Sequence, residues 1–183
     1  MFLITLKFVR EMIQKIPEYE SKDLDDLFQW IILAENEPFF ENYIKMYLEH
    51  DNLSIHRINK HGQNLLIFAS EKFTNLKANH RMIETLLEHN PDLNLKDKKG
   101  NTALHYACKS KCLYYSSVHD LIKNGASLVL ENDAGQNSFS IAVNNPEIDL
   151  STFDFLVEKF KQEKFNVEFL STRIDVKLTN LNN

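Results

Sequence analysis

Glycine is rare in this chain of 183 residues, and three of its four glycines recur at a nearly constant spacing. Gly62, Gly100 and Gly135 stand 35 to 38 residues apart. Glycine adopts backbone conformations that cost other residues free energy, so each of the three is expected to mark a turn. A period of roughly 20 to 50 residues is typical of repeat architectures. The sequence therefore predicts a stack of similar units.

Each of these glycines opens the same register. The three stretches read GQNLLIFA, GNTALHYA and GQNSFSIA, with an alanine seven residues after each glycine. Further along each unit stands an apolar pair, which would form the buried stripe of a second helix. These pairs are Leu86-Leu87, Leu121-Ile122 and Leu156-Val157. Each unit is therefore predicted to contain two helices.

Short alternating segments precede the second and third turn glycines, at Leu93–Leu95 and Leu128–Leu130. Such segments suit an extended hairpin that leads into a turn. Gly125, with Asn90 in the same position one unit earlier, is expected to end the preceding helix, because both residue types tolerate the left-handed C-cap.

The middle unit resembles a known repeat family. Residues Asp97–Cys108, DKKGNTALHYAC, are similar to the ankyrin-repeat signature D-x-x-G-x-T-P-L-H-x-A-A, with Ala103 in place of proline. Asn124–Leu128, NGASL, resembles the N-G-A-D-V that ends an ankyrin repeat. With Phe28–Ile58 as a degenerate leading unit, the resemblance covers about two thirds of the chain. It implies an all-α fold, an ankyrin-like α-solenoid of about three to four helix-turn-helix repeats with short hairpin loops.

The spacing departs from that family in one respect. The distance from each turn glycine to its apolar pair is longer than in an ankyrin unit, so the helices or the turns that join them must be longer. The extra residues are predicted at Phe73–Asn79, Lys111–Ser116 and Asn144–Leu150.

The N-terminal part lacks the glycine register but carries apolar stripes at helical spacing, such as Phe2, Leu6 and Val9. We predict three regions: residues 1–50 as an N-terminal helical cap that includes a degenerate leading repeat, 51–163 as the ankyrin-repeat array, and 164–183 as a C-terminal closing segment and tail. End units of a solenoid must shield its core, which favours the capping role. Ile16-Pro17-Glu18 keeps open an F-box-like adaptor that binds a partner through the N-terminal helices.

Composition limits the function classes. The chain has 21 basic and 26 acidic residues and a net charge of −5, which argues against nucleic acid as a partner. Two cysteines are too few for a disulfide framework and fit a reducing compartment. The apolar start Met1–Val9 lacks the basic region of a signal peptide, and no other stretch approaches the roughly 18 apolar residues of a membrane span. We expect a cytoplasmic protein without a membrane partner, located in the host cytosol if it is a translocated effector.

One group of residues in the sequence has the spacing of metal ligands. His105, Cys108 and Cys112 lie at i, i+3 and i+7, so a helix could turn all three to one side and a zinc-binding protein stays open as an alternative. The repeat signature already accounts for His105 and Cys108, and a closed zinc site needs a fourth ligand. Phosphate-binding and nucleophile motifs are absent. We therefore predict no catalytic residue, no metal and no cofactor, with an enzyme that pairs a cysteine and a histidine distant in sequence as a further alternative.

The resemblance also implies a binding site. Ankyrin proteins usually hold partners in a concave groove formed by the hairpin tips and the first helix of each unit. The corresponding tip residues here are Lys60, His61, Gln63, Lys98, Lys99, Asn101, Asp133, Ala134 and Gln136. The corresponding helix residues are Glu71, Lys72, Lys109, Ser110, Asn144 and Asn145.

Five of these positions are lysine and two are acidic, although the whole chain is negative. A basic groove would steer an acidic segment of a partner protein toward the middle units. We expect a monomeric, non-catalytic module for protein-protein interaction. Two contexts stay open, a bacterial effector-type ankyrin protein secreted to act on host proteins and a small housekeeping adaptor.

Overall fold

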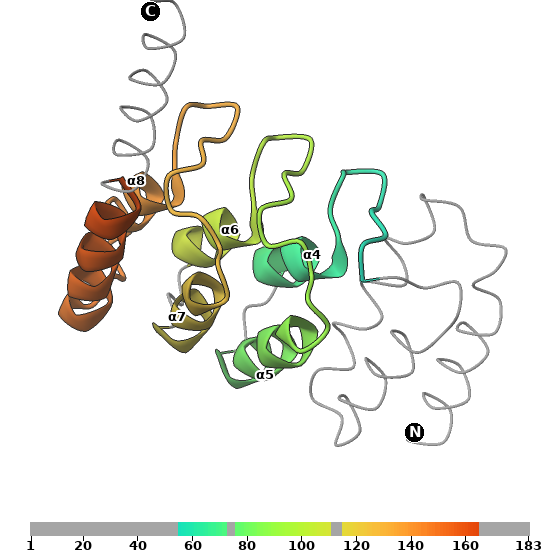
Figure 1. Cartoon of the computed structure of the whole chain (residues 1–183), viewed down its shortest axis with the longest axis horizontal. Coiled ribbons are helices and arrows are strands. Elements are labelled where there is room, and N and C mark those ends of the chain that lie inside the picture. Colours follow the sequence, from blue (N-terminus) through green and yellow to red (C-terminus); the bar gives the residue numbers. More distant parts are fainter. Residues whose placement is uncertain (1–54, 73–75, 111–114, 165–183) are drawn as a thin grey trace, which may run out of the picture.

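The computed structural model of the protein describes residues 55–72, 76–110 and 115–164. Within these ranges the chain forms three pairs of helices, each preceded by a hairpin loop (Figure 1). The pairs are α4 (Leu65–Lys72) with α5 (Leu76–Leu87), α6 (Ala103–Lys109) with α7 (Tyr115–Lys123), and α8 (Ser138–Val143) with a helix over residues 150–164. The predicted all-α solenoid of helix-turn-helix units is confirmed.

The helices form two layers. The short helices α4, α6 and α8 lie side by side as an inner layer, with α6 packed against both neighbours (Figure 1). The outer layer holds α5, α7 and the helix over residues 150–164, and the hairpins project in a row from the opposite side of the inner helices. The inner helices are therefore enclosed between their neighbours, their outer partners and the hairpins.

The inner helices begin at polar capping residues in the same register. Asn64 and Asn137 accept a hydrogen bond from the backbone N–H three residues on, at 2.9 and 2.8 Å. Thr102 holds the same position before α6. The two asparagines satisfy helix N–H groups that have no partner within the helix, which fixes where α4 and α8 start.

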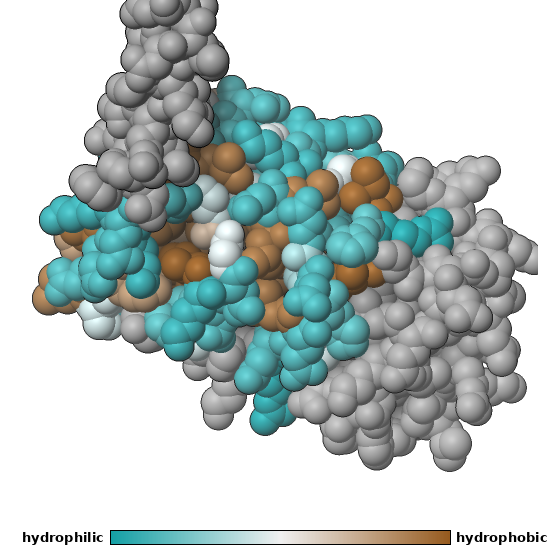
Figure 2. Space-filling view, in the orientation of Figure 1, coloured by the Kyte–Doolittle hydropathy of each residue, from teal (hydrophilic) through white to brown (hydrophobic). Residues whose placement is uncertain are grey.

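Burial differs between the layers as the sequence predicts. Residues 65–70 of α4 are all buried, and only its last two residues, Glu71 and Lys72, reach the solvent. The outer helices instead bury one stripe, and Leu86, Leu121 and Leu156 are fully buried as the first member of each predicted apolar pair. Figure 2, in the orientation of Figure 1, shows hydrophilic residues over the hairpins and outer helices, with apolar residues between them.

The outer helices end as expected. Asn90 and Gly125, just past α5 and α7, have positive φ angles of 50° and 103°. These residue types take that conformation at lower cost than others, which explains their recurrence at the end of successive units.

The segments predicted to hold the extra residues are described in part. Residues 76–79 of the predicted interval Phe73–Asn79 belong to α5, whereas residues 73–75, and residues 111–114 of the interval Lys111–Ser116, lie outside the described residues. Residues 144–149 connect α8 to the last helix. Asp149 caps that helix, because it accepts hydrogen bonds from the Ser151 and Thr152 side chains and from the Thr152 backbone N–H, and these bonds lower the pKa of its carboxyl group to about 2.

Several predictions lie outside the described residues. They are the N-terminal cap at residues 1–50 with its adaptor alternative, the tail beyond residue 164, and Cys112. The segments around Leu93–Leu95 and Leu128–Leu130 lead into the hairpins but form no strand in the described ranges, where one isolated bridge joins Glu131 and Asn137. No helix within the described residues has the length and apolar character needed to cross a membrane.

Candidate functional site

The three hairpin tips have the same internal geometry. Each begins with Asn59, Asp97 or Asn132, whose side-chain oxygen accepts the backbone N–H groups two and four residues on at 2.8 to 3.0 Å. The backbone N–H of the same residue donates to the carbonyl four residues on, at 2.9 Å in every tip. Short polar side chains stabilise turns in this way, so the asparagine or aspartate fixes the tip as much as the glycine does.

Successive tips are also joined to each other. The Lys98 N–H donates to the His61 carbonyl at 3.0 Å, and the Asp133 N–H donates to the Lys99 carbonyl at 3.1 Å. The hairpins therefore form a ladder in which each tip donates to the tip before it.

Gly100 lies where two tips approach most closely. Its φ is +73°, and a Cβ atom placed on it would stand 2.6 Å from Asp133 Oδ1 and 2.7 Å from the Asp133 backbone nitrogen. A side chain at this position would force the next hairpin to move.

His105 joins the middle unit to the last one from below the hairpins. Its Nδ1 accepts the Thr102 N–H at 3.1 Å, so Nε2 carries the hydrogen and donates to the Gln136 carbonyl at 3.1 Å. Burial lowers the pKa of this imidazole below 6.5. The histidine is therefore neutral, and both ring nitrogens are engaged by protein groups.

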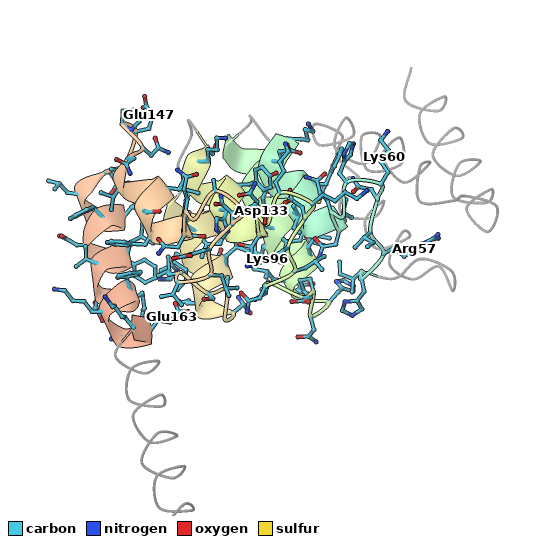
Figure 3. The ribbon with its side chains drawn as sticks, turned by 90° about the horizontal axis from the view of Figure 1, so that it is seen from above. Arg57, Lys60, Lys96, Asp133, Glu147 and Glu163 are labelled. Atoms are coloured by element: carbon cyan, nitrogen blue, oxygen red, sulfur yellow. The ribbon has the colours of Figure 1, made fainter. Side chains whose placement is uncertain are left out.

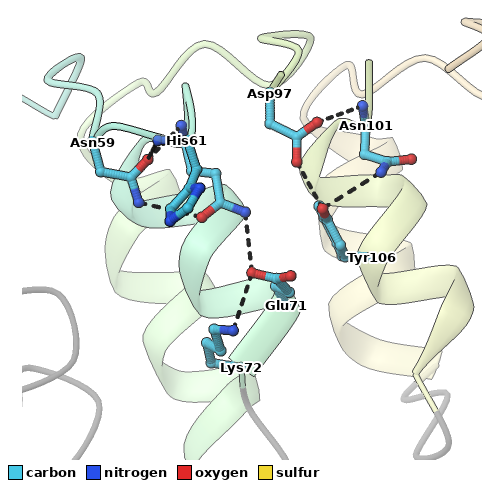
Figure 4. Close-up of polar contacts among 8 residues, drawn as sticks. Asn59, His61, Glu71, Lys72, Asp97, Asn101 and Tyr106 are labelled. Carbon is cyan, nitrogen blue, oxygen red and sulfur yellow. Dashed lines mark hydrogen bonds and ion pairs between the residues drawn. The ribbon is translucent and has the colours of Figure 1, made fainter. Parts of the chain in front are cut away.

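A second polar network lies between the middle hairpin and α6 (Figure 4). The Tyr106 hydroxyl donates to Asp97 Oδ2 at 2.6 Å and accepts from the Asn101 amide at 3.4 Å. Asn101 Oδ1 in turn accepts from the Asn132 amide at 2.8 Å. Burial and the bond to Asp97 raise the pKa of Tyr106 well above its ordinary value, so the phenol stays protonated. This network holds the hairpin against the inner helix.

Above this network is a groove of about 670 Å³ between the middle and last units. We call it the central groove. It is lined by two hairpins and by side chains of α6 and α8: Lys98, Lys99, Asn101, His105, Tyr106, Lys109, Asn132, Asp133, Ala134, Gln136, Ile141 and Asn144. Figure 3, which looks down on the hairpins, places Asp133 over the middle of the array.

The central groove carries unpaired positive charge. Lys98, Lys99 and Lys109 are exposed, and within the described residues their ammonium groups form no hydrogen bond or ion pair. Asp133 is the one carboxylate with comparable exposure in the lining. Asp97, beneath the hairpin, is buried and occupied by its own turn and by Tyr106. The groove therefore presents a net positive charge on a chain of net charge −5.

The first unit differs, because its polar side chains bind one another (Figure 4). Gln63 is 3 % exposed, accepts from the Asn59 amide and donates to Glu71 Oε2 at 3.1 Å. Lys72 Nζ stands 3.5 Å from the same Glu71 oxygen and 5.8 Å from the centroid of the Phe68 ring. Three of the predicted site residues are therefore engaged within the unit.

The remaining predicted residues divide in the same way. Lys60 and His61 are exposed on the first tip, and Gln136 is exposed on the last one. Asn145 is buried, and its amide donates to the Cys108 and Ser110 carbonyls at 2.9 and 2.8 Å. It ties the connection after α8 to the end of α6 and offers no free group to a partner.

Cys108 and His105 serve the packing of the repeat. Cys108 is fully buried in α6, and burial raises the pKa of its thiol to about 12, far from the thiolate needed for nucleophilic attack or metal binding. The described residues contain no group of three or more metal-binding side chains. Both observations fit the assignment of these residues to the repeat signature.

Four residues of the central groove were not predicted from the sequence as protein-binding residues: His105, Tyr106, Asn132 and Ile141. Tyr106 and Ile141 occupy the same register position, six residues after a turn glycine, where the first unit has Phe68. A recurrent large side chain at that position was the available signal.

A comparison with protein-family models matches residues 20–132 to ankyrin repeats in three copies. No match was found among curated proteins. The unit that follows residue 132 lies outside the matched range but has the same tip and helix pair. Ankyrin repeats are generally modules for protein-protein interaction and are not catalysts. Because the matched residues make up more than half of the chain, the protein belongs to the ankyrin-repeat family.

Proposed function

We propose that the protein binds an acidic segment of a partner protein in the central groove, without catalysis. The observation that carries this proposal is the set of three exposed lysines, Lys98, Lys99 and Lys109, without internal partners among the described residues on a groove of about 670 Å³.

The pairing of charges indicates which part of the array would bind the acidic segment. In the first unit Glu71 offsets Lys72 at 3.5 Å, so that part of the concave side offers a partner less net charge than the sequence suggests. In the middle unit the residue that corresponds to Glu71 is Lys109. The positive potential is therefore concentrated between the middle and last hairpins, where it would steer negative segments into the groove.

The groove is suited to a peptide segment because its floor is fixed. Asp97, Asn101, Tyr106 and Asn132 are hydrogen-bonded to one another, so the surface is formed before binding. A preformed surface loses less conformational entropy on association than a flexible one. We also propose a reducing, cytoplasmic place of action, because the chain has two cysteines, too few for a disulfide framework.

The first test uses charge reversal with a matched control. The variant Lys98→Glu/Lys99→Glu changes two groove lysines, and Lys123→Glu/Lys161→Glu makes the same change in charge at exposed positions on the outer helices. Affinity capture from lysate, followed by mass spectrometry, would be run in parallel with the wild type and both variants. We expect one dominant partner that the wild type and the outer-helix variant retain and the groove variant loses.

Binding kinetics with that partner then test the mechanism. The groove variant should slow association strongly at low salt and much less at about 1 M salt, where the Debye length is roughly 3 Å. Equal association rates for the two double variants at low ionic strength would remove the central groove from the site. Turnover of a metabolite library by a protein that captures no partner would instead support an enzyme.

A further inference from the structure

The last hairpin differs from the other two in what lies beside it. The third residue of each earlier tip uses its carbonyl as an acceptor, since His61 accepts from Lys98 and Lys99 accepts from Asp133. The corresponding carbonyl in the last tip belongs to Ala134. Within the described residues no donor reaches it, and the residue is exposed. The ladder of hairpins therefore ends on an open acceptor.

The space beside this carbonyl is open as well. A Cβ atom placed on Gly62 would stand 3.2 Å from the Lys98 nitrogen, and one on Gly100 would stand 2.7 Å from the Asp133 nitrogen. One placed on Gly135 would meet no atom of the described residues within 4 Å. Each earlier tip is covered by the backbone of the next tip, whereas no part of the described chain covers the last tip.

The exposure of equivalent residues on the three inner helices also indicates that the last unit is open. Ser70, Cys108 and Val143 occupy the same register position on α4, α6 and α8. Ser70 is 3 % exposed and Cys108 0 %, in helices that are each followed by another inner helix. Val143, on the last inner helix, is 43 % exposed. An apolar side chain is therefore exposed where the other two units bury theirs.

The hydrogen-bonding character of the last tip restricts what can cover it. All five backbone N–H groups of residues 132–136 are engaged, four within the tip and one with Lys99. The backbone of the tip can therefore accept further hydrogen bonds but has no N–H group left to donate. Two copies of this tip cannot pair symmetrically through their backbones, so the occupant must supply the donor.

We propose that Ala134, Gly135 and Val143, which we call the open end, bind a hairpin–helix unit of another repeat protein. The backbone N–H of its turn donates to the Ala134 carbonyl, and the side of its helix that follows the turn covers Val143. The interface continues the ladder that already joins the three tips. The open end shares Ala134 with the lining of the central groove but uses none of its lysines, and the proposal does not depend on the proposed function.

The test uses a probe built from the chain itself. A synthetic peptide of residues 94–110, with Cys108→Ser as in the first unit, contains the middle tip and α6, the very unit that covers the first hairpin and α4. It is titrated into the ¹⁵N-labelled full-length protein. We expect amide shifts confined to residues 133–136 and 139–143. Methylation of the Lys98 peptide nitrogen removes the one donor and should weaken binding by about fivefold or more.

Two variants of the full-length protein make the test specific. Val143→Lys should weaken peptide binding about tenfold or more by placing a charge in the apolar contact. Leu150→Lys is the matched control, because Leu150 is 81 % exposed at the start of the last helix and its replacement should leave binding unchanged. Gly135→Asn should also block binding with little loss of stability, since asparagine tolerates positive φ, as Asn90 does here.

Other outcomes of the titration would overturn the proposal or identify a different occupant of the open end. Absence of shifts at millimolar peptide, or shifts centred on the first tip or on the groove lysines Lys98, Lys99 and Lys109, would overturn the proposal. A molecular mass that rises with protein concentration and falls with Val143→Lys would identify a second copy as the occupant. Shifts at residues 165–183 caused by Val143→Lys in the free protein would identify the chain's own terminal residues.

Discussion

Alanine substitutions at Gly100 and Gly135 separate two costs that a side chain can have at a hairpin tip. The two glycines have nearly the same backbone conformation, with φ of +73° and +70°. Alanine at either position carries the penalty of the left-handed region, about 1 to 2 kcal/mol. Only at Gly100 would the new methyl group also contact the following hairpin, 2.6 Å from Asp133 Oδ1 and 2.7 Å from the Asp133 nitrogen.

The second cost can be estimated from the same contacts. Two of the three nearest atoms belong to backbone, at Asp133 and Asn132, so a change of rotamer cannot relieve the clash. Overpacking of this kind costs about 1 to 3 kcal/mol. The movement also threatens the bond from the Asp133 N–H to the Lys99 carbonyl at 3.1 Å. We expect Gly100→Ala to lose about 2 to 5 kcal/mol and Gly135→Ala about 1 to 2 kcal/mol.

Urea denaturation followed by circular dichroism measures the difference. At a slope of about 2 kcal/mol per molar urea, a gap of about 2 kcal/mol between the variants is a midpoint gap of about 1 M. Gly100→Val should be less stable still, because a β-branched residue is strongly disfavoured at positive φ. Equal midpoints for the two alanine variants would refute the close approach of the middle and last hairpins, and with it the register that joins them.

Three further predictions concern pH, the last helix and metal. The pKa of His105 is lowered in the folded state, so its contribution to stability is present above pH 6.5 and is lost as pH falls below that value, and His105→Gln should flatten this part of a pH–stability profile. Glu163→Ala removes the acceptor for the Ser127 hydroxyl and for the Leu128 N–H at 2.8 Å, and should cost about 1 to 3 kcal/mol by thermal denaturation. A chelator should leave the melting temperature unchanged and elemental analysis should find no stoichiometric zinc, because both ring nitrogens of His105 bind protein groups; one zinc per chain would contradict this.

The architecture could be predicted because it depends on backbone constraints visible in single residues. Gly62, Gly100 and Gly135 were expected at turns, and all three have positive φ. Leu86 and Leu121 were expected in the buried stripe of second helices, and both are fully buried. Such positions are decided locally, by φ or by helical spacing, so a repeating pattern reports them directly.

The candidate site was less predictable because equivalent positions are not equivalent environments. Gln63 and Gln136 share a register, yet the first is 3 % exposed and bound to Glu71 whereas the second is exposed. The difference depends on which side chain stands eight residues on, glutamate or Asn144, and on whether another hairpin follows. The position of a residue in the repeat reveals neither its neighbouring side chain nor whether another hairpin follows.

The role of Tyr106 was also not predictable from its position in the repeat. Its place in the repeat signature accepts many residue types, so the recurrence of a large side chain there indicates packing but predicts no polar contact. Its role comes from Asp97, nine residues earlier, which the hairpin brings within 2.6 Å of the hydroxyl. A side chain that is unconstrained in the repeat can still be fixed by one contact particular to this chain.

The exposed lysines of the central groove cannot by themselves supply the affinity of a specific complex. An exposed ion pair contributes about 0.2 to 1 kcal/mol, so three such pairs amount to a few kcal/mol at low salt and less in the cell. A micromolar complex requires about 8 kcal/mol. The remainder must come from surface that loses water on binding, and within the groove Tyr106 and Ile141 are the half-buried side chains able to provide it. We infer that charge selects which segments arrive and speeds their arrival, while the fit of the segment to Tyr106 and Ile141 determines how long it stays.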